Sequence, residues 1–286
     1  MLIKRNILLF FRDKANVFFS LLAVFIIIGL YALFLGNQMQ RALREEIGFD
    51  SDKINVIMAG VTLAGMVAVT SVTSSLGALG ISVADRKDAA KDFYTSPVSR
   101  GKVTISYILG SAVVGLVMTL AALALCVAYI AAHGGGVPGP ADTARLLFTA
   151  VLSVLCGNAM VFFLTMFIKS QNAFSAVSSV IGTLIGFLMG IYIPVGVMPE
   201  AAQWAIKCFP MSHAASMFKQ ILADGGLTEL FAEAPPEALE GFREMYGVAF
   251  TYGNTAGGFW LSAAVLAVTT AVFYALSLAA AKARRV

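Results

Sequence analysis

The chain has 286 residues, of which 59% are hydrophobic and 13% are charged. A soluble globular domain is about half apolar and about a quarter charged, so the composition excludes an ordinary soluble protein and predicts an integral membrane protein. The net charge of +4 does not indicate nucleic-acid binding, because the basic residues lie beside the apolar runs, where membrane topology places them.

Residues 1–14 are predicted to form an amphipathic helix that lies on the membrane surface. Apolar side chains recur on one side of this helix and basic side chains on the other. The apolar side carries Ile3, Ile7, Phe10 and Phe11, and the basic side carries Arg5 and Arg12.

Six uncharged runs follow, each at least as long as the roughly 20 residues that a helix needs to cross a bilayer. They predict an all-α integral membrane protein, with one transmembrane domain over residues 1–286. With the N-terminus placed in the cytoplasm, most basic residues of the short loops fall on the cytoplasmic side, so both termini are expected there. The expected spans are about 17–36, 55–82, 103–132, 146–168, 173–193 and 256–280.

The segment 194–254 is the largest piece expected outside the membrane. Several prolines interrupt it, and amphipathic helical patterns occur at 201–209 and 212–222. Its apolar content predicts outer re-entrant helices between the fifth and sixth spans.

Spans two and three are joined by the only sizeable charged stretch on the predicted cytoplasmic side. As a helix, residues 84–94 place acidic side chains on one stripe and basic side chains on a neighbouring one. Neighbours three or four residues apart are mostly like-charged, so the helix gains little from its own charges, about a few tenths of a kcal/mol per pair. We therefore predict a docking element for a partner, with a solvated loop as the alternative. The stripes are Asp85, Asp88 and Asp92, and Lys87 and Lys91.

The sequence lacks the groups that enzymes and self-powered carriers require. No ionisable residue lies in the middle of a predicted span, which disfavours a proton-coupled carrier. There is no phosphate-binding loop, since Gly101-Lys102 is followed by Val103. His133 and His213 fall in outer segments, and the cysteines have no metal-ligand spacing. We expect neither catalysis, nor a bound cofactor, nor a metal in this chain.

Two helical stripes are candidates for the wall of a cargo path. Thioether and hydroxyl side chains recur at helical spacing in span two, and span five carries a second stripe. Hydroxyls in a membrane helix also bond to their own backbone, so helix packing is the alternative. The candidates are Met58, Thr62, Met66, Thr70 and Thr73 in span two, and Thr183, Phe187 and Ile191 in span five.

Glycines repeat every four residues in span five, at Gly182, Gly186 and Gly190. Small residues at this spacing let another helix approach closely. We interpret these glycines as a helix-packing face rather than as ligand-binding residues.

The run from Asp85-Arg86-Lys87 to Ser96-Pro97-Val98-Ser99-Arg100 resembles the acidic-Arg element and the following Ser-Pro-Val segment of type-2 ABC exporter permeases. The resemblance extends over nearly the whole chain. It identifies the stretch between spans two and three as a coupling helix and residues 1–14 as an elbow helix. The coupling residues that it implies are Asp85, Arg86, Lys87, Asp88, Lys91, Asp92, Phe93, Tyr94 and Thr95.

The resemblance implies the permease subunit of an ATP-driven exporter in a bacterial plasma membrane. A separate cytoplasmic ATPase subunit would bind ATP and Mg²⁺, and a second copy or a homologous permease would complete a dimer in the lipid bilayer. The cargo would be a small amphipathic compound, drug or peptide. Two other hypotheses stay open, namely export of a glycan or lipid-linked polymer, and a non-transporting scaffold or sensor that docks a cytoplasmic partner.

Overall fold

The computed structural model describes residues 2–31, 33, 53–88, 99–232, 235–252 and 255–283, and most of them are helical. The principal helices are α1 (Leu2–Arg12), α2 (Lys14–Leu30), α4 (Lys53–Asp88), α6 (Arg100–Ala132), α7 (Pro140–Thr165), α8 (Gln171–Leu188) and α13 (Phe259–Ala283). The shorter elements are η2 (Val195–Val197), α9 (Glu200–Cys208), α10 (Pro210–Leu222), α11 (Asp224–Leu230), α12 (Pro236–Met245), β1 (Phe250–Tyr252) and β2 (Thr255–Gly257).

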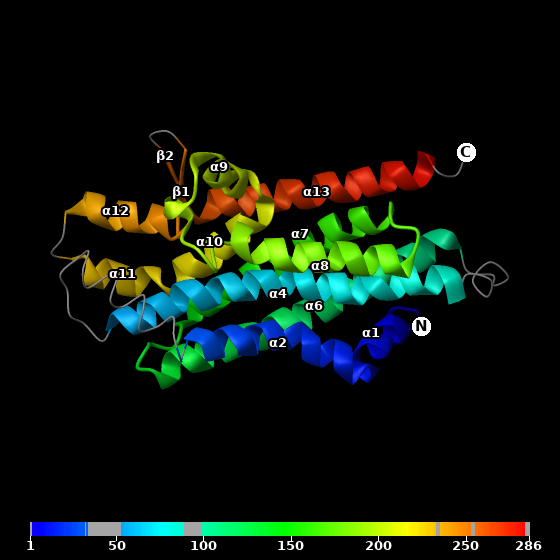
Figure 1. Ribbon diagram of the computed structural model, residues 1–286, viewed down its shortest axis with the longest axis horizontal. Coiled ribbons are helices and arrows are strands. Elements are labelled where there is room, and N and C mark those ends of the chain that lie inside the picture. The colour runs from blue at the N-terminus through cyan, green and yellow to red at the C-terminus, as the bar shows by residue number, and fades with distance from the viewer. Residues whose placement is uncertain are drawn as a thin grey trace.

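The principal helices form an elongated bundle, and the shorter elements gather toward one end of it (Figure 1). We call this the capped end. α1 begins and α13 ends at the opposite end, which we call the terminal end (Figure 1). Within the described residues the chain therefore starts and finishes on the same side of the bundle.

α4 is the central helix of the bundle. Its apolar stretch is 89% buried inside the chain, against 17% for the corresponding stretches of α8 and α13. It packs against α6, α7, α8, α10 and α2. Many residues of α4 are small, so they take little room between helices. Their hydroxyl groups are already bonded to carbonyls of their own helix, as Thr70 is to Met66 and Ser75 to Ser71. The neighbouring helices can then approach closely.

Five helices of the described chain are long and apolar enough to cross a membrane, namely α4, α6, α7, α8 and α13. They coincide with the predicted second to sixth spans and support a helical, multi-pass membrane protein. α2 has 17 residues and meets the same length requirement only together with α1, from which it bends by 76°. The complete six-span layout and the elbow helix stay predictions.

The bend between α1 and α2 has a local cause at Asp13. Its carboxylate accepts hydrogen bonds from the backbone N–H groups of Ala15 and Asn16, at 3.1 and 3.2 Å. A side chain in this position satisfies the free donors at the start of a helix, so α2 begins here as a new helix.

Two of the span boundaries that differ from the predicted ones have a local cause in the sequence. α7 begins at Pro140 rather than near residue 146, because proline fits the first turn of a helix, where its missing N–H is not needed. α8 ends at Leu188 rather than at 193, because Gly190 has φ of 60° and turns the chain out of the helix. Gly190 therefore terminates span five.

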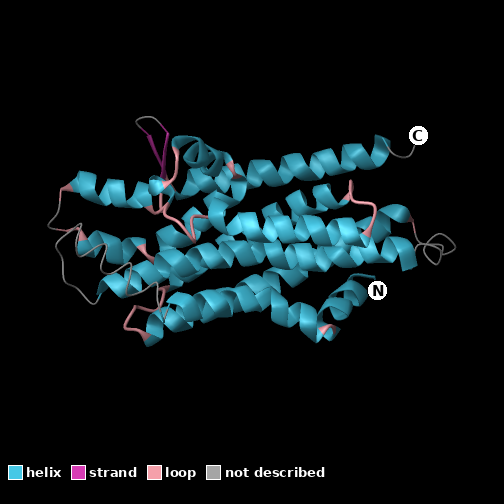
Figure 2. Cartoon of the chain, in the orientation of Figure 1, coloured by secondary structure: helices cyan, strands magenta, loops and turns pink. Residues whose placement is uncertain are grey.

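The capped end contains the predicted helices at 201–209 and 212–222, which are α9 and α10. α10 packs against α4, α7 and α13, so it is inserted among the long helices. The all-α prediction misses one feature, an antiparallel hairpin in which Phe250 pairs with Gly257 (Figure 2). Its three-residue strands are too short to give a clear alternating pattern.

Candidate functional site

A charged cluster at the terminal end joins three helices. Asp85, near the end of α4, accepts two hydrogen bonds from the guanidinium of Arg5 on α1, at 2.8 and 3.1 Å. The hydroxyl of Tyr107 on α6 donates to the same carboxylate at 2.6 Å. The Asp85 side chain is 13% exposed and that of Arg5 is 36% exposed. The fork of arginine fits a carboxylate closely, so the cluster fixes α1, α4 and α6 relative to one another.

A second set of contacts holds α1 against α6. Asn6 is buried, and its amide donates to the Ser106 hydroxyl at 3.4 Å. A Cβ added to Gly110 would lie 3.0 Å from the Asn6 Cβ, so the glycine lets the helices approach closely. Phe10 is fully buried against Ala78 of α4 and other apolar side chains. α1 is thus packed into the bundle at its terminal end.

Asp85 lies in a cluster with side chains of two other helices. Its carboxylate is engaged by Arg5 and Tyr107 within the chain, and its role in docking a partner stays a prediction. The next residues, Arg86, Lys87 and Asp88, continue α4 as helix. The remaining predicted coupling residues lie outside the described part of the chain, and they are Lys91, Asp92, Phe93, Tyr94 and Thr95.

The sequence did not single out Arg5 or Tyr107 as partners of Asp85. Arg5 stands on the basic side of the amphipathic pattern in residues 1–14, and this was the only signal for it. Tyr107 lies in an apolar run and carried no signal.

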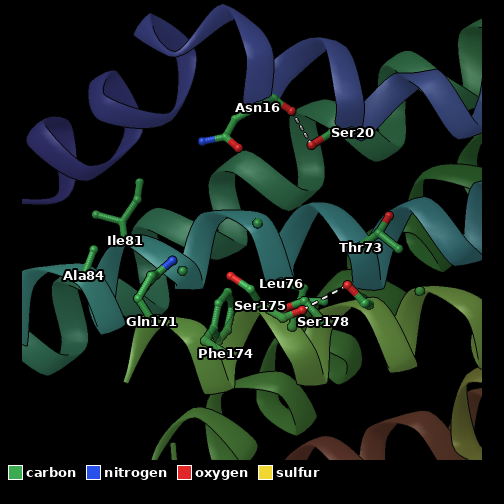
Figure 3. Close-up of a pocket in the computed structure, with 14 residues that line it drawn as sticks. Asn16, Ser20, Thr73, Leu76, Ile81, Ala84, Gln171, Phe174, Ser175 and Ser178 are labelled. Atoms are coloured by element: carbon green, nitrogen blue, oxygen red, sulfur yellow. Dashed lines mark hydrogen bonds between the residues drawn. The ribbon is translucent and has the colours of Figure 1, made fainter. Parts of the chain in front are cut away.

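A groove of about 740 Å³ lies beside this cluster, between α2, α4 and α8 (Figure 3). Hydroxyl and amide side chains from all three helices face it, together with a few apolar ones. No charged side chain lines it among the described residues. The polar residues are Asn16 and Ser20 on α2, Thr73 on α4, and Gln171, Ser175, Ser178 and Ser179 on α8; the apolar side chains are Leu76, Ile81, Ala84 and Phe174.

Glycines shape the α4 wall of the groove. A Cβ added to Gly80 would lie 2.9 Å from the ring of Phe174, so only glycine leaves room for this aromatic side chain of α8. The hydroxyl oxygen of Ser178 is buried and makes no hydrogen bond within the described structure. Such a group is costly unless a ligand or water satisfies it, so Ser178 is a candidate ligand contact.

The groove contains only part of the predicted cargo path. Thr73 lines it, but the predicted residues nearer the capped end do not, because they are buried where α4 packs against its neighbouring helices, α10 among them. There a Cβ on Gly60 would lie 2.9 Å from the Leu222 carbonyl oxygen. The buried residues are each at most 2% exposed, and they are Met58, Thr62, Met66 and Thr70.

The span-five stripe is divided in the same way. Thr183 and Phe187 are exposed on α8 and do not line the groove. Ile191 lies beyond the end of α8 and is buried, where its side chain meets Gly65 of α4. The predicted stripe is therefore not one continuous wall.

The three glycines of span five have three different surroundings within the described chain, and their role as a helix-packing face stays a prediction. Gly182 lines the groove, and a Cβ there would meet nothing within 4 Å. Gly186 packs against the ring of Tyr192, a residue of the loop that follows. Gly190 lies outside the helix in a left-handed turn. Local contacts or backbone conformation therefore account for Gly186 and Gly190, but not for Gly182.

His213 lies in the outer segment that the sequence predicts for it, but it is buried there. It is 3% exposed on α10, and its ring nitrogens lie 3.1 Å from the Ser262 hydroxyl and 3.1 Å from the Lys207 carbonyl oxygen. Burial lowers the pKa of this histidine below its ordinary value. His213 therefore serves to join α10 to the start of α13.

Comparison with known families gives one match. Residues 1–223 match the family model described as ABC-2 type transporter, which covers most of the chain. No match was found among curated protein sequences.

Proposed function

The chain belongs to the ABC-2 type transporter family as a permease subunit, and we propose that it exports a small amphipathic compound, drug or peptide with energy from ATP. The observation that carries this proposal is the groove between α2, α4 and α8. Its hydroxyl and amide groups suit neutral polar groups of a cargo, and Leu76, Ile81 and Phe174 suit an apolar part. The lack of lining charge favours a neutral amphipathic cargo over a strongly charged one.

A separate cytoplasmic subunit would bind and hydrolyse ATP with Mg²⁺, because this sequence holds no phosphate-binding loop. We place its docking element at the stretch from Asp85 to Thr95. The contacts of Asp85 with Arg5 and Tyr107 would then pass movement of this element to α1 and α6. This permease would itself have no enzymatic activity.

This arrangement implies an orientation in the membrane. The terminal end would face the cytoplasm of a bacterial cell, with α1 as the elbow helix and α2 as the first of six spans. The capped end would lie outside. The excess of basic residues in the predicted cytoplasmic loops supports this orientation.

A second permease, either identical or homologous, would complete the cargo path. Asn16, Ser179 and Gly182 line the groove at exposed positions. The groove therefore has an open side on α2 and α8. Two such half-grooves facing each other would enclose one cavity on a shared axis.

The decisive experiment is transport by the reconstituted complex. The permease is purified with the ATPase subunit that accompanies it from its native membrane, and inside-out vesicles are tested for ATP-dependent uptake of a neutral fluorescent amphiphile. We expect uptake, and we expect Ser179→Trp to reduce it at least about tenfold by filling the groove. Val180→Trp is the matched control, since Val180 is also exposed on α8 but does not line the groove.

Other outcomes separate the remaining hypotheses. ATP-dependent uptake of a fluorescent oligosaccharide alone would establish the glycan hypothesis. A complex that assembles but moves neither probe would support the scaffold or sensor hypothesis. Equal uptake by the Ser179→Trp and Val180→Trp variants would remove the groove from the cargo path.

A further inference from the structure

Lys219 is a buried lysine at the capped end of the bundle. It lies on α10 and is 1% exposed. No carboxylate pairs with it in the part of the chain that the structure describes. Its ammonium nitrogen instead donates hydrogen bonds to the carbonyl oxygens of Tyr246, at 2.8 Å, and Met189, at 3.3 Å.

Both carbonyls stand at the ends of helices. Met189 is the residue that follows α8, and Tyr246 is the residue that follows α12. Each carbonyl is followed by a glycine in the left-handed conformation, Gly190 with φ of 60° and Gly247 with φ of 63°. Because the last carbonyls of a helix carry partial negative charge, Lys219 is held between two helix C-termini.

Both glycines lie beside the ammonium, since a Cβ added to Gly190 or to Gly247 would be in ordinary contact with its nitrogen, at 3.6 Å. Their left-handed turns disfavour other residues. A buried charge is costly, and an apolar side chain would fill the same space without that cost. The reason for a lysine at this position therefore lies in the elements that Lys219 joins.

Lys219 joins α8, which forms one wall of the groove, to the helices of the capped end. The α8 residues that line the groove lie between Gln171 and Gly182, toward the terminal end. Nearer the capped end α8 and the loop after it close onto α4. There a Cβ on Gly65 would lie 2.7 Å from the Ile191 side chain, and Ile185 and Met189 are buried. Lys219 lies where the groove is closed.

We infer that Lys219 is a positioning residue that keeps the groove closed at the capped end, by tying the end of α8 to α10 and α12. The inference rests on the proposed transport function. To open this end, α8 must move away from α10, which breaks the bond to Met189. The shorter bond to Tyr246 stays, so Lys219 remains with the cap while α8 moves.

The join is tested by hydrogen–deuterium exchange of the assembled complex in lipid nanodiscs without nucleotide. The amides of Gly190 and Ile191 close the end of α8, and those of Gly247 and Val248 close the end of α12. In Lys219→Met we expect exchange in both segments, 186–193 and 243–249, to become about ten- to a hundredfold faster, as for loss of a hydrogen bond to a charged group.

Gln220→Met is the matched control. The Gln220 amide donates to the Val248 carbonyl at 2.9 Å and to the Ser216 hydroxyl at 3.0 Å, so it joins α10 to the segment after α12 but makes no hydrogen bond to α8 in the described structure. We expect this variant to expose 243–249 alone. Wild-type protection of 186–193 in Lys219→Met, or equal exposure of this segment in both variants, would overturn the inference.

Two further measurements separate a local effect at the end of α8 from unfolding of the bundle and from failure of the proposed function. If Lys219→Met unfolds the whole bundle, Lys219→Gln keeps a polar side chain of shorter reach and should expose 186–193 without speeding exchange in α6. Protection of 186–193 in this variant would count against the inference.

The second measurement adds an ATP analogue to the wild-type complex. We expect exchange in 186–193 to become faster and exchange in 243–249 to stay at its rate without the analogue. If uptake depends on ATP and 186–193 does not respond, the gating role is overturned. If uptake is absent but Lys219→Met still exposes 186–193, the proposed function fails and the join stands.

Discussion

Arg5 and Asp85, eighty residues apart in the chain, form a two-pronged ion pair that ties α1 to the last turn of α4. The pair lies where α4 leads toward the predicted docking element, and Tyr107 attaches α6 to the same carboxylate. One carboxylate thus links three helices at the end of the bundle where a partner is expected to act. In the proposed function, movement of the docking element reaches α1 and α6 through this point.

Replacing Arg5 by Met should therefore lower both stability and coupling. We expect the free energy of unfolding to fall by about 1 to 2 kcal/mol, less than for a buried pair because the Arg5 side chain is 36% exposed. Cargo-stimulated ATP hydrolysis should fall further than basal hydrolysis. Lys4→Met is the control, since Lys4 is an exposed base on the same helix. Equal effects of the two variants would show that the bond between Arg5 and Asp85 contributes neither to stability nor to coupling.

Tyr107→Phe removes a single hydroxyl from the same cluster. Because this hydroxyl donates to a carboxylate that keeps its two bonds from Arg5, we expect a loss of about 1 kcal/mol in unfolding free energy. A double-mutant cycle with Arg5→Met should give a non-additive result, since both residues bind one carboxylate. Strict additivity in thermal unfolding would contradict a shared cluster.

The apolar runs were sufficient to predict the spans that α4, α6, α7, α8 and α13 form, because bilayer thickness fixes their length. The groove was harder to predict. Asn16, Ser20 and Ser178 are uncharged residues in apolar helices, where hydroxyls and amides also serve packing. The sequence favours a path along Met58 and its neighbours because it does not reveal that they are buried inside the bundle.

The same limit applies to charges at the two ends of the bundle. Lys219 looked like one base on an amphipathic helix, and its role follows from two carbonyls that lie about thirty residues from it on either side. Asp85 was recognised as important, but its partners come from two other helices, and no local spacing brings them together.

Ser178→Ala tests whether the groove binds cargo. The hydroxyl is buried and makes no hydrogen bond in the described structure, so its removal should not lower the free energy of unfolding and should raise it by up to about 1 kcal/mol. If cargo supplies the missing partner, binding should weaken by about fivefold, as for one neutral hydrogen bond. The measurement is binding of the neutral fluorescent amphiphile to the purified complex.

Ser153→Ala is the control for this experiment, because Ser153 is buried on α7, outside the groove, and its hydroxyl bonds to the Ala150 carbonyl. Ser153→Ala should leave binding of the amphiphile unchanged. If Ser178→Ala also binds the amphiphile as tightly as wild type, Ser178 does not contact the cargo.

Lys219 should make stability depend on pH. Burial lowers its pKa from 10.5 to about 7. Between these values the unfolded chain binds a proton that the folded chain has released, so the contribution of Lys219 to stability rises with pH from about 7 to about 10.5 and is lowest below pH 7. In Lys219→Met this part of the rise should disappear, while Gln220→Met should keep it. Parallel stability profiles for wild type and Lys219→Met would contradict the assignment.

The final prediction concerns the docking element, whose like-charged neighbours gain little from one another and so call for complementary charges on a partner. Arg86→Glu and Asp88→Lys should each reduce co-purification of the ATPase subunit or uncouple hydrolysis from export. Phe93→Ala tests the apolar part, since loss of an aromatic anchor from an interface can cost about 2 kcal/mol, roughly thirtyfold in affinity. Membrane insertion should survive all three changes.

Lys169→Glu is the control for this set, because Lys169 lies in the exposed turn between α7 and α8, outside the docking element. It should retain the ATPase subunit at the wild-type level. A solvated loop predicts that the three docking variants behave like this control, because surface changes away from a contact shift stability by only about 0.5 kcal/mol. Normal subunit recovery with intact cargo-stimulated hydrolysis in every variant would therefore decide for the solvated loop and leave the partner's docking site to be found elsewhere.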